Sequence, residues 1–133
     1  MSIEVDGEIW AKVRYAFAEA LGLEEDEVEL DQLIIGDLEA ESLDFLDIAF
    51  RLERAFDIKI PRGGIEKEAH EAGGVDEDGL LTADGVQRLR EAMPEVPPDE
   101  IAVGMSTSRI PETFRVATFY TLVVKLIAEK AAA

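Results

Sequence analysis

The sequence predicts an all-α fold, and three observations lead to that prediction. Apolar residues recur at three- and four-residue spacing in four segments, which is typical of helices that bury one face. Long polar loops separate these segments, and no strand pattern is stronger than "FDIKI". The chain shows no internal repeat. We therefore expect a small helical bundle of the four-helix type with an inserted loop and helix region.

The first predicted helix covers residues 8–22. Its apolar positions share one face, and Gly22 is a natural stop because glycine readily adopts the left-handed conformation of a helix end. The last predicted helix includes "FRVATFYTLVVKLI". Lys125 and Lys130, near its C-terminus, would interact favourably with the negative end of the helix dipole. Another helix is predicted over residues 83–93, with Thr82 as its N-terminal cap.

The remaining segment, about 42–56, is predicted to be an amphipathic helix that ends before Pro61. Three further apolar residues broaden its apolar face and suggest contacts on more than one side: Phe45, Ile48 and Leu52. The outward side is predicted to hold Asp44, Asp47, Arg51, Glu53 and Arg54. The inward stripe is predicted to hold Leu43, Leu46, Ala49, Phe50, Ala55 and Phe56.

A long acidic connection, "LEEDEVELDQLIIGDLEAE", precedes this helix. Long loops in small domains are usually either functional or disordered. Apolar residues interrupt the acids, and we interpret them as anchors onto the core: Leu23, Val28, Leu30, Leu33, Ile34, Ile35 and Leu38. We therefore expect an ordered loop that presents the start of the helix.

Composition limits the classes of function. The 133 residues suit one domain, and the formal net charge of -17 repels nucleic-acid phosphates and anionic lipids while favouring basic protein patches. Without cysteine there is neither a thiolate nucleophile nor a disulfide framework. Neither a membrane-length apolar run nor a basic leader is present, so a cytoplasmic protein without membrane insertion is expected.

Ser42 stands between the acidic loop and the second helix. A serine there is a good helix cap, and that is its simplest interpretation. A helix N-terminus also stabilises a phosphate, because its first N–H groups lack partners within the helix and the dipole is positive there. A phosphate ester on Ser42 would suit this position.

The stretch "ESLDFLDIAFRLERAFDIKIP" resembles the core of an acyl carrier protein. The resemblance runs without gaps from Leu38 to Pro61, and the first and last predicted helices fit the family's ends. It implies a carrier without catalytic activity, in which Ser42 bears a 4'-phosphopantetheine arm attached by a separate transferase. The thiol of that arm would hold acyl groups as thioesters, although the chain has no cysteine.

The resemblance also implies roles for neighbouring residues. Basic patches on the enzymes that load, elongate and transfer acyl groups would dock on acids at Glu41, Asp44, Asp47 and Glu53. The space for an acyl chain would lie between helices, next to Phe45, Leu46 and Ala49. We expect one monomeric carrier domain over residues 1–133, serving fatty acid, lipid or polyketide synthesis.

Three features depart from the family pattern. Glu41 replaces the usual aspartate before the serine, and Arg51 and Arg54 interrupt a face that is usually more acidic, which suggests specialised partners. The largest departure is an insertion at about 62–112, between core segments 1–61 and 113–133. The insertion either enlarges the acyl pocket or forms a surface specific to certain partners.

Two other classes of function remain open. The first is an unmodified acidic helical adaptor that binds basic proteins. The second is a hydrolase that uses Ser42 with His70, although no nucleophile-elbow pattern surrounds the serine. No metal site is expected, because an EF-hand alignment on Gly79 puts Gly74 and Gly85 where the terminal carboxylate ligands belong.

Overall fold

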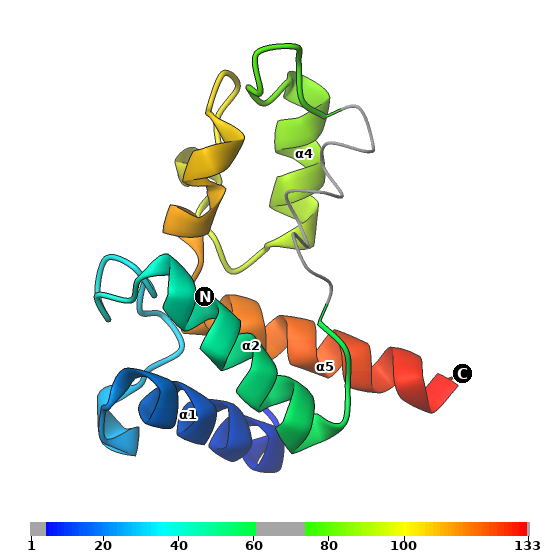
Figure 1. The fold of residues 1–133 in the computed structure, drawn as a ribbon. Helices are drawn as coiled ribbons and strands as arrows, with labels where there is room; N and C mark the ends of the chain where they lie inside the picture. Colours follow the sequence, from blue (N-terminus) through cyan, green and yellow to red (C-terminus); the bar gives the residue numbers. More distant parts are fainter. Residues whose placement is uncertain (1–4, 61–73, 133) are drawn as a thin grey trace.

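The computed structural model describes residues 5–60 and 74–132, and it confirms the all-α fold (Figure 1). Within those residues no strand is formed, and only isolated β-bridges occur. Short 3-10 turns cover Glu25–Glu27, Pro98–Glu100 and Thr107–Thr113. The α-helices described are α1 (Gly7–Leu21), α2 (Ser42–Phe56), α4 (Ala83–Ala92) and α5 (Val116–Ala132). Their positions match the four predicted segments closely. His70 lies outside the described residues.

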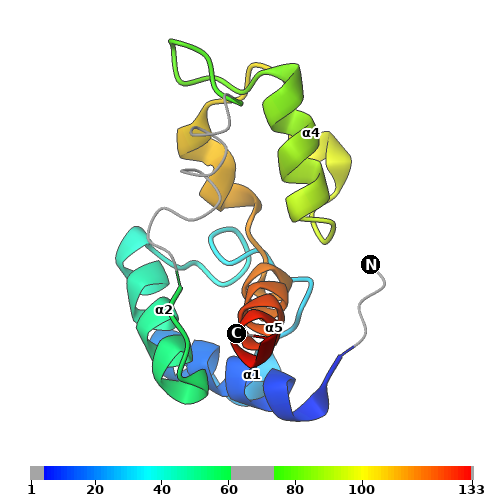
Figure 2. The same cartoon turned by 90° about the vertical axis from the view of Figure 1, so that its right-hand side faces the viewer.

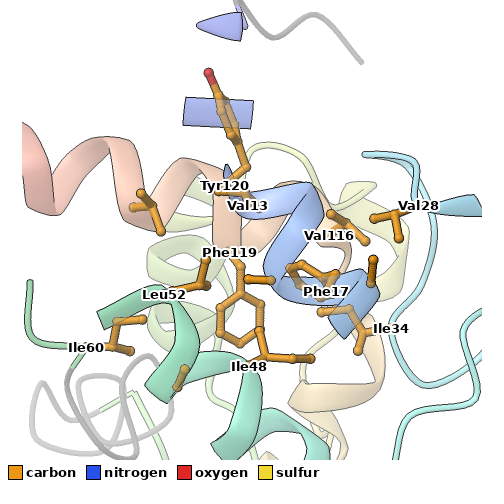
Figure 3. Close-up of a cluster of buried hydrophobic side chains, with 14 of the residues drawn as sticks. Val13, Phe17, Val28, Ile34, Ile48, Leu52, Ile60, Val116, Phe119 and Tyr120 are labelled. Carbon is orange, nitrogen blue, oxygen red and sulfur yellow. The ribbon is translucent and has the colours of Figure 1, made fainter. Parts of the chain in front are cut away.

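Helices α1, α2 and α5 form the lower layer of the molecule in Figure 1. Helix α1 packs against both α2 and α5, and α2 also contacts α5. Their shared core includes Val13, Phe17, Ile48 and Val116, all fully buried (Figure 3). The rings of Phe17 and Phe119 meet edge to face, 5.8 Å apart at their centroids, a favoured aromatic geometry.

The C-terminal end of α1 and the N-terminal end of α4 form as the sequence predicts, and the structure adds a cap at the start of α1. Asp6 caps α1 by accepting hydrogen bonds from the backbone N–H groups of Glu8 and Ile9 at 3.0 and 3.2 Å. Gly22 ends α1 in the left-handed conformation, with φ at 67°. Thr82 caps α4 through a hydrogen bond from the N–H of Gly85 at 3.1 Å.

The part of the insertion that is described builds a second apolar cluster. Helix α4 and the 3-10 turn Thr107–Thr113 stand side by side above the bundle in both views (Figures 1 and 2). The cluster is made of Leu81, Val86, Leu89, Met93, Val96, Ile101 and Ile110, all buried. The sequence predicted the helix but not this separate core, nor the longer 3-10 turn, which lacks a helical stripe.

Phe114 and Arg115 join the two clusters. Phe114 packs against both. The buried guanidinium of Arg115 donates to the Thr113 carbonyl at 2.6 Å and to the Glu100 carboxylate at 2.5 Å. The backbone here also pairs with the acidic loop, since Ile34 donates to the Phe114 carbonyl at 3.0 Å. Insertion, loop and α5 therefore meet at this short segment.

The buried face of α2 differs from the predicted one. The helix buries Ile48, Ala49 and Leu52, and Phe45 also lies on that side against Phe114 and Phe119. The predicted stripe is wrong for four residues: the exposed fractions of Leu43, Leu46 and Phe50 are 77%, 45% and 48%, and Ala55 is exposed as well. Two apolar rows lie side by side on this helix, and α1 and α5 cover only one of them.

The acidic connection is ordered, as its anchors predict. Val28 and Ile34 are fully buried, and Leu23, Leu30 and Leu38 pack against the core as partly buried side chains. Asp37 accepts a hydrogen bond from the N–H of Leu33 at 2.8 Å. These contacts hold the loop against the core, and the loop thereby positions the start of α2.

Candidate functional site

Ser42 is the first residue of α2, which is where the sequence predicts it. Its side chain lies outside what the structure describes. The residues on either side, Glu41 and Leu43, are both exposed, so the chain passes along the surface here. Ser42 thus stands at a helix N-terminus between two exposed residues, a position that suits a phosphate-linked group.

The backbone before Ser42 is held in a defined turn. Leu38 and Ala40 donate backbone hydrogen bonds to the carbonyls of Leu33 and Ile34, both at 3.1 Å. Between them Glu39 takes a left-handed φ of 57°, a conformation that costs energy for a residue with a side chain. The buried Ala40 then anchors the last step into α2.

Asp44 caps α2. Its carboxylate accepts a hydrogen bond from the backbone N–H of Glu41 at 2.7 Å, bridging the residues before and after Ser42. An acid at the third helical position also interacts favourably with the positive end of the helix. The sequence placed Asp44 on a docking surface, and the structure adds this role in shaping the serine's turn.

The other predicted docking acids also have partners within the chain. Asp47 forms an ion pair with Arg51 one helical turn later, at 3.0 Å. Glu53 accepts a hydrogen bond from the N–H of Ile60 at 2.8 Å, which fixes the chain as it leaves α2. The Asp47 side chain remains 45% exposed, so its pairing with Arg51 leaves it accessible to a partner protein.

The exposed row Leu43, Leu46 and Phe50 adds an apolar surface beside these acids. Sequence reasoning placed these residues in the core and so missed them as surface residues. Their spacing of three and four does separate them from the buried row, but it does not show which row a neighbouring helix covers. Exposed large apolar residues close together are typical of interaction sites.

The three residues expected near an acyl chain do not all share one environment. Ala49 is buried, and Phe45 lies within the α2–α5 interface against the rings of Phe114 and Phe119. Leu46 is on the exposed side of α2. Of the three, only Phe45 and Ala49 face the interior between helices.

Metal-binding side chains do not gather within residues 5–60 and 74–132, where no group of three or more His, Cys, Asp or Glu residues is placed to hold an ion. Over the same ranges, none of the helices has both the length and the apolar character needed to cross a bilayer.

Comparison with known proteins identifies the family. Residues 11–63, which include Ser42, match the family described as "Phosphopantetheine attachment site". The acyl carrier protein of Borrelia garinii subsp. bavariensis is 45% identical over 64 residues, covering 75% of that protein and 48% of this chain. The acyl carrier protein of Campylobacter lari is 39% identical over 59 residues, covering 77% of that protein and 44% of this chain.

The fold and this match define a phosphopantetheine-binding carrier, and the chain belongs to the acyl carrier protein family. Its prosthetic group is covalently attached 4'-phosphopantetheine. Carriers of this family work with a phosphopantetheinyl transferase and with acyl-handling enzymes, and they are not themselves catalysts. The alignments leave about half of this chain without a counterpart.

Proposed function

We propose that Ser42 carries the 4'-phosphopantetheine arm, and that the chain shuttles acyl groups between enzymes of fatty acid, lipid or polyketide synthesis. The observation that carries the proposal is the position of Ser42, at the start of α2 between two exposed residues and within the matched family segment. The thiol of the arm supplies what this cysteine-free chain lacks, a group that holds acyl chains as thioesters.

The chain itself orients the attachment point and receives partners. Asp44 and the turn at Glu39 set the direction in which α2 begins. The acids Glu41, Asp44, Asp47 and Glu53 form an acidic docking surface for basic patches on the transferase and the acyl-handling enzymes. Steering between opposite charges gives fast association without requiring tight binding, which suits a carrier that visits several enzymes.

The exposed apolar row beside the acids supports this docking surface. Leu43, Leu46 and Phe50 would be covered by a partner's apolar residues once charge has brought the two proteins together. For the cargo, we propose that an acyl chain lies near Phe45 and Ala49, with Leu46 at its outer edge.

We also propose that residues 1–133 act as one monomeric, cytoplasmic carrier domain, with its core in 1–61 and 113–133. The insertion, about 62–112, would then be an appended unit with its own apolar cluster, joined to the carrier core at Phe114 and Arg115. This arrangement supports an insertion that offers a surface to particular partners.

The test is enzymatic loading followed by intact mass measurement. The chain, incubated with coenzyme A and a broad-specificity phosphopantetheinyl transferase, should gain one phosphopantetheinyl group. Ser42→Ala should gain none, whereas Ser108→Ala, a matched change at an exposed serine, should load like the natural chain. Loading of Ser42→Ala would show that the site is wrong. Failure of the natural chain with several transferases would favour the unmodified adaptor.

A further inference from the structure

A groove of roughly 630 Å³ lies between α1 and α2. Three alanines and Tyr15 give it apolar walls, and Lys12, Arg51 and Arg54 contribute three cationic side chains. Glu25 is the one acid that lines it. The residues that line the groove therefore carry more positive than negative charge on a strongly acidic protein, and one further acid, Glu19, stands next to Tyr15 at its edge.

This concentration of cations runs against the composition of the surrounding chain. Residues 1–61 contain 17 acidic and 5 basic side chains. Three of those five bases, Lys12, Arg51 and Arg54, line this one groove. A positive site within a negative field selects for a compact anion, because an extended anion would also meet the surrounding acids.

The three cations are available to a ligand to different degrees. The Lys12 ammonium lies 5.5 Å from the centre of the Phe56 ring and remains exposed. Arg51 pairs with Asp47, which offsets part of its charge. Arg54 is exposed and forms no ion pair with any residue that the structure describes. Lys12 and Arg54 therefore provide most of the unneutralised charge.

We propose that the groove between α1 and α2 binds a short acidic segment of a partner protein. Carboxylates of that segment would pair with Lys12 and Arg54, and an apolar side chain between them would lie against the alanines and Tyr15. Nucleic acids and anionic membranes carry charge over longer distances than the groove spans, so the neighbouring acids would repel them.

This binding goes beyond the carrier function and does not require the arm at Ser42. On α2 it would place a cation-lined site at Arg51 and Arg54 one to two turns beyond the acid Asp47, on the same face of the helix. A partner with matching charges at both positions would dock in one orientation only, whereas a partner with a uniformly basic surface would be repelled at the groove.

The test uses a fluorescein-labelled Glu-Glu-Phe-Glu-Glu peptide and fluorescence anisotropy at low salt. The natural chain should bind it, and the double variant Lys12→Glu, Arg54→Glu should bind at least about tenfold more weakly, because attraction at both positions becomes repulsion. The matched control is the double variant Lys59→Glu, Lys125→Glu, which reverses two exposed charges outside the groove, changes the net charge by the same amount and should bind like the natural chain. Circular dichroism checks that each variant is folded.

Two outcomes would overturn the proposal: no binding of the acidic peptide to the natural chain, or an equal loss of binding in the control variant. Ser42→Ala, which should not load, should still bind the acidic peptide with unchanged affinity. That result separates the groove from the carrier function, since either proposal can fail while the other stands.

Discussion

Asp44 shows how one side chain near the site combines structural and functional roles. Its hydrogen bond to the Glu41 N–H closes the turn around Ser42, and it contributes acidity to the proposed docking surface. A sequence pattern reveals the acid and its place in the first turn. The role of the hydrogen bond depends on where the loop backbone directs its N–H group, and that follows only from the packing of the whole loop.

Asp44→Ala is expected to lower the free energy of unfolding by about 1 kcal/mol, the usual cost of losing a capping residue. Asp47→Ala, which removes an acid and an ion pair one turn later, should cost less, about 0.3–0.5 kcal/mol. Urea unfolding followed by circular dichroism measures both. Equal costs for the two changes would contradict the capping role of Asp44.

Gly85 is a residue whose identity is set by the backbone of another segment. A Cβ atom at this position would lie 2.0 Å from the Gly74 carbonyl oxygen. Gly85→Ala should therefore destabilise the chain by about 1–3 kcal/mol, although alanine is the better helix former. Gly7→Ala is the matched control, since a Cβ there meets nothing within 4 Å. Thermal unfolding should show opposite shifts of the two midpoints, and a stabilised Gly85→Ala would refute this contact.

At the scale of elements, the position of each helix could be predicted, but the buried face of α2 could not. Leu43, Leu46 and Phe50 are as apolar as Phe45, Ile48 and Leu52, and both rows have helical spacing. Only the approach of α1 and α5 decides which row is covered. The glycines and prolines of the insertion likewise indicated where it lies. They did not reveal its apolar cluster, because that cluster forms only when α4 and the following loops pack together.

Glu95 lies at the contact between the end of α4 and helix α5, with only 4% of its surface exposed. Neither of its carboxylate oxygens makes a well-formed hydrogen bond to the residues that the structure describes. Burial raises the pKa of this carboxyl, while the nearby Thr118 and Thr121 hydroxyls and the Arg115 guanidinium oppose the rise. Arg115 also forms an ion pair with Glu100, so only part of its charge is available to stabilise the Glu95 carboxylate.

This raised pKa has a defined effect on stability. The folded chain holds the Glu95 proton more tightly than the unfolded chain, so the contribution of Glu95 to stability falls as pH rises above its usual pKa of 4.5. Glu95→Gln, which cannot ionise, should be more stable than the natural chain at neutral pH by about 1–3 kcal/mol. The difference should shrink toward pH 4.5 in urea unfolding, and a difference independent of pH would contradict the role of ionisation.

At the scale of the whole molecule, a net charge of -17 governs how partners approach. We predict that kcat/KM for loading by the transferase falls as salt rises from about 20 to about 300 mM, because screening shortens the range of electrostatic attraction. Glu41→Gln and Asp47→Asn should raise KM more than they change kcat, and Glu129→Gln, near the end of α5, should change neither. Loading rates that are insensitive to salt would contradict the acidic docking surface.

The central claim, that Ser42 carries the arm, is tested most directly by locating the modification. No Lys or Arg lies between Arg14 and Arg51, so trypsin releases Tyr15–Arg51 as one peptide, in which Tyr15 and Ser42 are the only hydroxyl-bearing residues. Tandem mass spectrometry of loaded protein should place the phosphopantetheinyl group on that peptide, at Ser42. Finding it on the peptide with Ser106 and Ser108, or anywhere other than Ser42, would contradict the account.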